Sequence, residues 1–467
     1  MRTNFIQASI TVSNLFYNQL LSLTDITLLR SEMSVSTTKS ADEAKDKVKT
    51  GQEEKESNTS GKKRPLTDTV EDASCTNEEE VESSSSVKKK LKTDTGQDTA
   101  GYSSKPSDLS TGSSRDSHGV SNNEKSDSTA LIAEHYNTLE EKSLSHRSQS
   151  RILYMRNFNN WIKSMLIYEY LTKVKQNKNH NSPLKVLDMC CGKGGDLLKW
   201  KKGEISHLIC ADIAEVSIEQ CKNRYNEMLN RSSNVRGFAP IFTAEFIAAD
   251  CTKVRLREKY KDVTIQLDLV SCQFAFHYSF ESLPQAECML RNASECLRPG
   301  GYFIGTVPDS YDLVSRWQKC EGDKFGNDVY SIEFVCKDKT KPPLFGAKYN
   351  FHLEGVVNCP EFLVHMPTLS KLASKFGLEL VMFERFDNYY EHVKNEGKSL
   401  LGKMQALETY PPYHESPLLG QHSQDYQHAI SYMQNLPDHR KIGTLSQAEW
   451  DATSLYAVFA FQKKEAE

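Results

Sequence analysis

The chain lacks the features that identify several large protein classes. No apolar run approaches the roughly 20 residues that a membrane-spanning helix needs, and polar side chains interrupt the patchily apolar stretch of residues 16–29, so we expect neither a membrane span nor a signal peptide. The 12 cysteines include no Cys-x-x-Cys pair, and the histidines form no cluster at zinc spacing. We therefore expect a metal-free protein of a reducing, intracellular compartment.

The chain also has little net charge, and that charge is unevenly distributed. It holds 58 Lys and Arg against 62 Asp and Glu, of which residues 1–130 carry 17 basic and 21 acidic side chains. The net charge of −4 thus belongs to this front segment, and the rest is formally neutral. Neutrality argues against a globally basic nucleic-acid coat protein, whereas a local basic patch is still compatible with RNA binding.

Residues 33–130 contain 20 serines, no tryptophan and one aromatic residue, Tyr102. Such a segment buries too little apolar surface to offset its ordering entropy, so we predict that it is disordered. Residues 1–32 hold more apolar side chains and are counted with this tail, residues 1–127, while Met33 is an alternative start. Two basic clusters interrupt it, at residues 62–65 and 88–92. They are either solvated charge runs or nuclear-import signals, and the second interpretation predicts a nuclear protein.

From residue 151 onward, apolar segments alternate with helical patterns. Apolar side chains at Trp161, Met165, Tyr168, Leu171 and Val174 recur at helical spacing and predict an amphipathic helix. The sequence predicts strands at 184–189, 207–211, 242–248, 265–271, 302–307, 378–383 and 454–461, helices at 214–230 and 283–297, and polar loops or insertions at 337–345 and 409–423. This alternation predicts a doubly wound α/β sheet.

Residues 186–196 run from an apolar strand through a glycine-rich turn into a helix, and the crevice beyond such a strand is a ligand site in open α/β sheets. The first glycine of a dinucleotide fingerprint is missing and Asp188 precedes the turn, which disfavours NAD. Asp212 follows the second strand, where a carboxylate can accept ribose hydroxyls, and Asp250 follows the third, where it can border an adenine. Together these positions indicate S-adenosylmethionine.

After the fourth strand comes the segment 271–281, which includes His277 and Tyr278. Enzymes that methylate amino groups of DNA usually carry Asp/Asn-Pro-Pro-Tyr/Phe at this place, and that motif is missing here. His277 and Tyr278 offer hydrogen bonds and a stacking face to a ligand. The alternative is a satisfied core histidine packed on an aromatic ring.

Taken in order, six segments resemble the nuclear mRNA cap guanine-N7 methyltransferase family in its animal form: residues 156–163, 192–200, 272–281, 299–306, 351–362 and 454–456. The resemblance runs from about residue 128 to the C-terminus. It implies a Rossmann-like class I S-adenosylmethionine-dependent methyltransferase domain over residues 128–467, with an N-terminal helical arm and insertions. It also implies methyl transfer to N7 of the terminal guanosine of the GpppN cap.

The resemblance further implies roles for individual residues. Those implied to hold S-adenosylmethionine are Lys163, Cys190, Asp212, Asp250, Gln273 and Tyr278. Those implied to line the cap site are Asn159, Asn160, Lys193, Lys199, Arg224, His277, Glu361 and Tyr456. A carboxylate can accept the N–H groups of guanine's Watson–Crick edge while an aromatic ring packs nearby, and basic groups can neutralise a triphosphate, although ordinary surface charge is the alternative for the latter.

The family usually has glycine where this chain has Cys190. Its side chain crowds the methionine part of the cofactor, or its backbone angle costs roughly 1 kcal/mol, so we predict weakened cofactor binding. A redox switch between Cys190 and Cys191 is a less favoured interpretation. The guanine N7 lone pair is free at neutral pH, so the reaction needs no general base, and we expect His277, Tyr278 and Glu361 to act by alignment.

Two rival functions stay open at this point. One is a small-molecule methyltransferase on the same sheet, since a fold does not determine a substrate. The other is a non-catalytic RNA-binding scaffold in which Cys190 has disabled the cofactor site. As partners, the resemblance implies capped mRNA, a small activating subunit and the RNA polymerase II capping machinery, and it implies no membrane.

Overall fold

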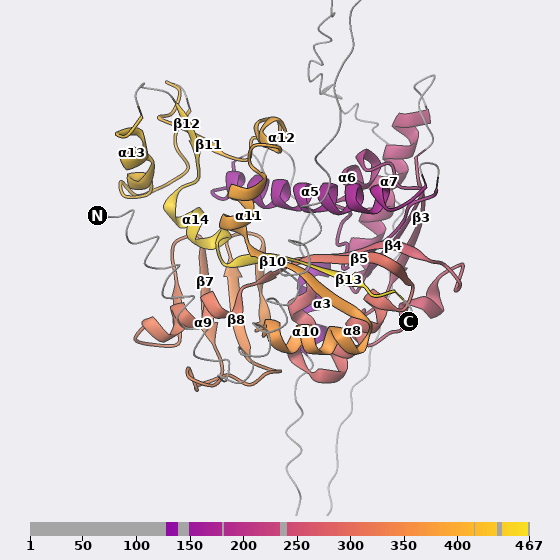
Figure 1. The fold of residues 1–467 in the computed structure, drawn as a ribbon. Coiled ribbons are helices and arrows are strands. Elements are labelled where there is room, and N and C mark those ends of the chain that lie inside the picture. Colours follow the sequence, from indigo (N-terminus) through magenta and orange to yellow (C-terminus); the bar gives the residue numbers. More distant parts are fainter. Residues whose placement is uncertain are drawn as a thin grey trace, which may run out of the picture. The chain divides into compact units, whose positions relative to one another are not determined.

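The computed structural model describes residues 128–138, 149–179, 182–233, 241–414, 416–436 and 441–465 (Figure 1). All of them belong to the second of two units, Arg115–Glu467. The predicted tail with its two basic clusters lies outside the described residues. Within them, no helix combines the length and apolar character that crossing a membrane would require.

The main sheet has the strand order β10-β13-β5-β4-β1-β2-β3. Five of its strands run parallel: β1 (Lys185–Met189), β2 (His207–Asp212), β3 (Thr243–Ala248), β4 (Leu267–Gln273) and β5 (Leu297–Pro308). Strand β13 (Tyr456–Lys463) runs antiparallel to both β5 and β10 (Leu378–Arg385). The strand order reverses between β1 and β4, which is where open α/β sheets bind ligands. The predicted doubly wound sheet is thereby confirmed.

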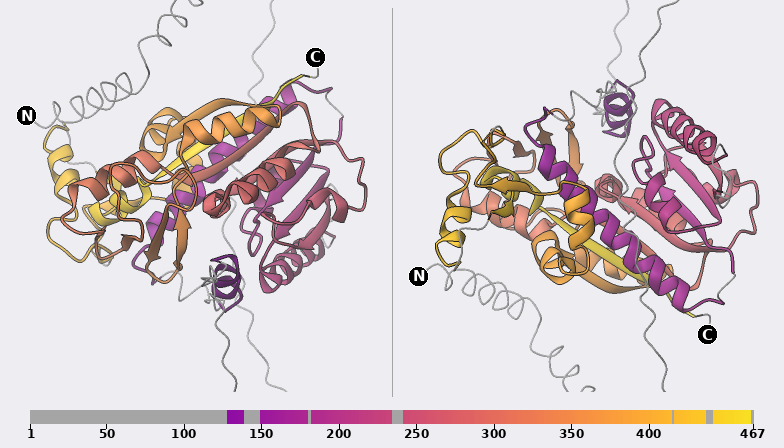
Figure 2. Two further views of the ribbon diagram at one scale, coloured as in Figure 1. Left: turned by 90° about the horizontal axis from the view of Figure 1, so that it is seen from below. Right: turned by 90° about the horizontal axis from the view of Figure 1, so that it is seen from above.

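Helices cover both faces of this sheet (Figure 2). Side chains alternate between faces along each strand, so Val186 and Leu208 contact one layer while Leu187 and Ile209 contact the other. The first layer contains α5 (Leu153–Gln176), α6 (Leu197–Lys202), α7 (Glu215–Ser233) and α11 (Phe386–Val393). The second contains α8 (Leu283–Ser294) and α10 (Met366–Lys375). Helix α8 ends before the predicted residue 297 because Leu297 already pairs with Leu267 in the sheet.

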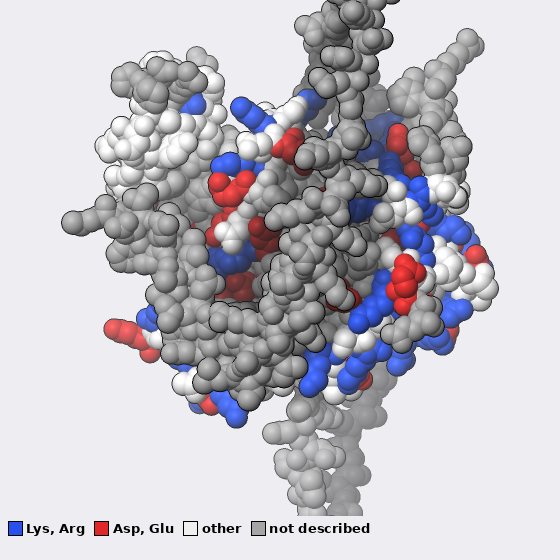
Figure 3. All heavy atoms as spheres, viewed as in Figure 1, with Lys and Arg blue, Asp and Glu red and all other residues white. Residues whose placement is uncertain are grey.

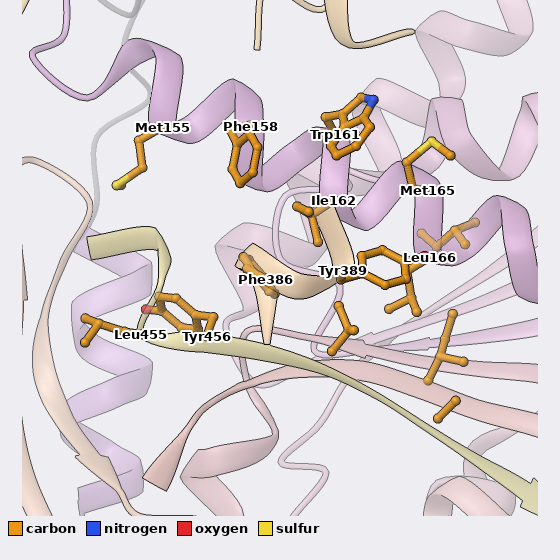
Figure 4. Packing of buried hydrophobic residues seen from close by; sticks show 14 of the residues in the cluster. Met155, Phe158, Trp161, Ile162, Met165, Leu166, Phe386, Tyr389, Leu455 and Tyr456 are labelled. Carbon is orange, nitrogen blue, oxygen red and sulfur yellow. The ribbon is translucent and has the colours of Figure 1, made fainter. Parts of the chain in front are cut away.

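Helix α5 is the predicted amphipathic helix, and its buried stripe shifts along its length (Figure 4). In its first half Phe158 packs on Tyr390 of α11 and on Trp450. In its second half Tyr170 packs on Tyr302 of β5. Tyr168 lies outside both contacts and is 56% exposed, so its predicted place on the buried face was wrong.

A second, antiparallel sheet follows α9 (Ser310–Lys319) and was not predicted. Its strands are β6 (Lys324–Gly326), β7 (Tyr330–Phe334), β8 (Lys348–Leu353) and β9 (Val357–Phe362). Strands β11 (Glu408–Tyr410) and β12 (Ile442–Thr444) also pair, so the start of the predicted loop at 409–423 is strand. The predicted loop at 337–345 contains neither helix nor strand. The remaining described helices are α3 (Ser128–Thr138), η1 (Leu256–Lys259), η2 (Phe276–Glu281), α12 (Lys398–Lys403), α13 (Gln427–Met433) and α14 (Gln447–Thr453).

Candidate active site

The glycine-rich turn between β1 and α6 has left-handed backbone at three positions: Cys190 (φ +56°), Gly192 (φ +53°) and Gly194 (φ +75°). Of these three residues only Cys190 has a side chain, so the left-handed conformation costs roughly 1–2 kcal/mol there, as predicted from the sequence. Its sulfur contacts the thiols of Cys251 and Cys272. The turn is therefore held in a backbone conformation that glycine would adopt without penalty.

Asp212 ties this turn to the end of β2. Its Oδ2 accepts the Gly192 N–H at 2.8 Å and its Oδ1 accepts the Ala214 N–H at 2.9 Å. The side chain is 8% exposed, and burial raises the pKa of Asp212 while these two N–H donors act in the opposite direction. A carboxylate has about four acceptor sites, so lone pairs are left over for two ligand hydroxyls.

Asp250 and Gln273 lie at the ends of β3 and β4. Oδ1 of Asp250 accepts the backbone N–H and the hydroxyl of Thr252, at 2.9 and 2.6 Å, which orders the loop that follows β3. Nε2 of Gln273 donates to Ser271 Oγ at 3.0 Å, whereas its Oε1 is buried and has no hydrogen-bond partner among the described residues. Because an unpaired buried acceptor costs free energy, Oε1 is a place where a ligand donor would stabilise the protein.

One carboxylate joins residues that were predicted for two different ligands. Asp196 Oδ2 accepts a hydrogen bond from Lys163 Nζ of α5 at 2.9 Å, and Asp196 Oδ1 lies 2.7 Å from Lys199 Nζ of α6. Lys199 Nζ also donates to Asn160 Oδ1 at 2.5 Å. Burial alone would raise the pKa of Asp196, but the charges of the two lysines outweigh it and lower this pKa to about 2.

Asp188 is the second carboxylate in this part of the site. It is buried and its Oδ2 accepts the Trp200 Nε1–H at 3.0 Å. Burial, and after it the charge of Asp196, raise the pKa of Asp188. The two lysines thus favour the ionised form of Asp196, whereas burial favours the neutral form of Asp188.

A second group of predicted residues surrounds Glu361 of β9. Glu361 is 3% exposed, its Oε2 accepts the Tyr349 hydroxyl at 2.9 Å, and its Oε1 lies 3.2 Å from Nε2 of His277. His277 is 1% exposed, its ring nitrogens make no well-oriented hydrogen bond with the described residues, and its ring packs at 4.3 Å on Tyr278. Burial, and after it the charge of Glu361, raise the pKa of Tyr456. A buried carboxylate, three tyrosines and a histidine thus share one small region.

Helix α3 adds Tyr136, which the sequence analysis missed. Its hydroxyl lies 3.1 Å from that of Tyr278, which in turn lies 3.4 Å from Cys359 Sγ. Burial is the main cause that raises the pKa of Tyr136, and the charges of Glu361 and Asp212 add to it. Tyr136 is therefore close to Asp212, the carboxylate predicted to bind ribose, and to Glu361, the carboxylate predicted to bind guanine. The only sequence signal for it is an aromatic residue in a polar stretch beside the predicted tail.

The other predicted residues lie around these groups. Lys193 belongs to the glycine-rich turn, and Arg224 of α7 is close enough for its charge to influence Cys221. Asn159 stands apart from its neighbour Asn160, because its Oδ1 accepts the hydroxyl of Thr453 in α14. The structure thus gathers the predicted residues into a strand-end group, a lysine–aspartate group and a Glu361 group, with Asn159 outside them.

The chain is similar in sequence to known proteins of one family. A family model described as the mRNA (guanine-N(7))-methyltransferase domain matches residues 119–464. A Drosophila melanogaster protein named mRNA cap guanine-N(7) methyltransferase is 56% identical over 338 residues, which cover 72% of this chain and 77% of that protein. A Caenorhabditis elegans protein of the same name is 40% identical over 346 residues, 73% of this chain and 88% of that protein. Among solved structures, an S-adenosylmethionine-dependent methyltransferase from Clostridium acetobutylicum has a TM-score of 0.34 and 12% identity, and covers 72% of this chain and 99% of that chain.

Proposed function

Because the chain belongs to the mRNA (guanine-N(7))-methyltransferase family and methylates the mRNA cap guanine at N7 with S-adenosylmethionine as donor, we propose which of its residues hold each reactant. Family membership sets aside the small-molecule methyltransferase and the non-catalytic scaffold. The proposal concerns the roles of the three residue groups, the way they promote transfer, and the partners of the protein.

The strand-end group holds the methyl donor, which supplies an electrophilic methyl group on its sulfonium. Asp212 accepts the ribose hydroxyls with the lone pairs that its two N–H donors leave over, and Asp250 borders the adenine. Gln273 Oε1, buried without a partner, accepts from a donor group of the cofactor. Cys190 and Tyr278 line the same space, and Lys163 pairs with the cofactor carboxylate.

The Glu361 group holds guanine, and the buried position of Glu361 is the observation that carries this proposal. A carboxylate 3% exposed is costly to desolvate unless its oxygens are paired. Tyr349 pairs one oxygen, and His277 stands beside the other without a well-oriented hydrogen bond. Guanine offers two N–H donors on its Watson–Crick edge, and these complete the pairing while Tyr456 packs against the base.

The lysine–aspartate group binds the triphosphate. Lys199, together with Lys193 and Arg224, supplies positive charge, and Asn160 supplies an amide group. Asn159 lies outside this group, with its Oδ1 bound by Thr453, and is kept as a further predicted cap contact. Lys199 forms an ion pair with Asp196 and donates to Asn160, so its ammonium group is held in place before the substrate arrives. A pre-positioned ammonium loses less conformational freedom on binding than a free one.

Catalysis rests on alignment. The N7 lone pair carries no proton at neutral pH, so no side chain has to remove one. His277, Tyr278 and Glu361 hold the base and the reacting groups in line, an arrangement whose effective molarity can reach about 10⁵–10⁸ M. Tyr136 supports it through the hydroxyl contact with Tyr278.

The test is methyl transfer from labelled S-adenosylmethionine to GpppG-capped RNA, with uncapped RNA as control. We expect Glu361→Gln to lower kcat/KM for capped RNA at least 100-fold while cofactor affinity stays the same. Glu354→Gln changes an exposed glutamate in the segment between β8 and β9 and serves as the matched control. Equal activity of both variants would contradict the assignment of Glu361 to guanine.

We further propose a nuclear location, a small activating subunit and contact with the RNA polymerase II capping machinery. Import would use the basic clusters at residues 62–65 and 88–92. On the face drawn in Figure 3, Lys and Arg side chains gather toward the side of α8, which favours contact with the RNA backbone. Replacing both clusters by alanine should leave a fluorescent fusion in the cytoplasm, and capped-RNA affinity should fall steeply with salt.

A further inference from the structure

Three cysteine side chains meet directly below the glycine-rich turn. The sulfur atoms of Cys191 in the turn, Cys210 in β2 and Cys221 in α7 all lie within 4.8 Å of one another. In the described part of the chain, no other group of three or more His, Cys, Asp or Glu side chains is as compact. All three are free thiols, two of them buried and Cys191 half-buried. They come from three separate elements, which is why no short cysteine spacing reveals them.

We propose that Cys191, Cys210 and Cys221 form a binding site for a thiophilic divalent metal ion such as Zn²⁺, and that its occupation weakens binding of S-adenosylmethionine. In a tetrahedral zinc site each sulfur lies about 2.3 Å from the metal, so that the sulfurs are roughly 3.8 Å apart. Sulfurs already within 4.8 Å of one another reach that spacing with small movements. The half-buried side of Cys191 leaves the fourth position to water.

The positions of the three thiols in the fold suit a bound metal ion. A metal ion takes thiolates as ligands and releases their protons when it binds. Two of the ligands stand on regular elements, β2 and α7, so only Cys191 has to move with its turn.

The coupling to the cofactor follows from how tightly the turn packs on these sulfurs. A Cβ built on Gly194 would lie 2.7 Å from Cys221 Sγ, so this sulfur packs directly against the backbone of the turn. The backbone N–H of Cys191 donates to Ala211 O at 3.1 Å, and that of Gly192 donates to Asp212 Oδ2 at 2.8 Å. Drawing Cys191 toward a metal ion therefore shifts the contacts of Asp212. This coupling rests on the proposed role of Asp212, whereas metal binding itself does not.

The experiment uses the full chain, reduced and freed of metal, without cofactor. Zn²⁺ is titrated in competition with a chromophoric chelator, and Co²⁺ is added separately to record the absorption bands of tetrahedral thiolate coordination. We expect one equivalent of Zn²⁺ to bind, and the Cys210→Ala and Cys221→Ala variants to lose at least 100-fold in affinity. Cys288→Ala, a half-buried thiol outside the cluster, is the matched control and should bind like the unchanged chain.

Two further measurements complete the test. Urea unfolding without metal identifies any variant that fails to fold. If Cys210→Ala or Cys221→Ala does not fold, the Zn²⁺ affinity of Cys191→Ser, which changes a half-buried residue of the turn, tests the site instead. Unchanged Zn²⁺ affinity in the cluster variants would overturn the proposal that these three cysteines bind the metal. A loss of Zn²⁺ affinity in Cys251→Ala but not in Cys210→Ala would overturn it as well. In the unchanged chain, saturating Zn²⁺ should raise the Kd of S-adenosylmethionine at least fivefold. Zinc binding with an unaltered Kd would overturn the coupling and leave the proposed function untouched.

Discussion

The substitution Asp196→Asn tests how far one buried carboxylate organises this site. Asp196 pairs with Lys163 at 2.9 Å and with Lys199 at 2.7 Å. Asparagine keeps the shape but has one acceptor oxygen and a donor NH₂ group, so one ammonium group would face another donor. Both lysines would then be partly buried without their negative partner.

The size of the effect can be worked out in two ways. The pKa of Asp196 falls from 3.8 to about 2 in the folded protein, which corresponds to about 2 kcal/mol at 1.36 kcal/mol per pH unit. Removing one partner of a buried ion pair typically costs about 3–5 kcal/mol. Because the lysine side chains keep 17% and 11% exposure, we expect a loss of about 2–4 kcal/mol at pH 7. The folded pKa is depressed, so this stabilisation is complete above the unfolded value of 3.8 and disappears as the pH falls toward 2.

The assay is urea unfolding at pH 7 and at several values down to pH 2, with Asp338→Asn as the control. Asp338 is an exposed carboxylate whose Oδ1 accepts from Thr340 and Lys341, and its replacement should leave the urea midpoint at pH 7 unchanged. We also expect Asp196→Asn to raise both the Kd of S-adenosylmethionine and the KM for capped RNA. A stability loss below about 1 kcal/mol, or a difference from wild type that persists at pH 2, would refute the reasoning.

Two further variants and one pH profile test other parts of the site. Cys190→Gly removes a side chain from a left-handed position (φ +56°) and should tighten S-adenosylmethionine binding up to about fivefold, an effect worth about 1 kcal/mol. An unchanged Kd in calorimetry would contradict the prediction that the Cys190 side chain crowds the cofactor. Tyr136→Phe removes the hydroxyl contact with Tyr278. We expect kcat/KM for capped RNA to fall two- to tenfold in a methylation assay, while the melting temperature in a thermal melt changes little. The chemical step in single-turnover experiments should be independent of pH between about 6 and 9, since N7 needs no base; a bell-shaped profile that vanishes in His277→Asn would contradict this.

The main sheet was predictable because its central strands are buried on both sides and alternate with helices, which leaves contiguous apolar runs such as residues 208–211. The second sheet was missed although one signal was present. In β8, Tyr349, Phe351 and Leu353 are buried and alternate with Asn350 and His352, which are exposed. That period of two is typical of a strand with one buried face.

The site was predictable only in part, for a different reason. Asp212 is the last residue of β2 and Asp250 follows the end of β3 by two residues, so their position along the chain locates them at the carboxyl edge of the sheet. The role of Asp196 depends on Lys163, 33 residues earlier, and on the way α5 crosses α6. Tyr136 likewise reaches Tyr278 across 142 residues. Contacts of this kind exist only after tertiary packing, and periodicity does not encode them.

Strand β13 has a consequence for how this protein is made. It is the last described strand in chain order, yet it lies inside the sheet, paired on both sides with β5 and β10. During synthesis these two strands leave the ribosome well before the segment that joins them, so each waits with an open edge. Unpaired strand edges make incompletely folded chains prone to aggregate. We therefore expect the nascent chain to depend on chaperones until residues 456–463 emerge, and nonsense mutations before them to abolish folding altogether.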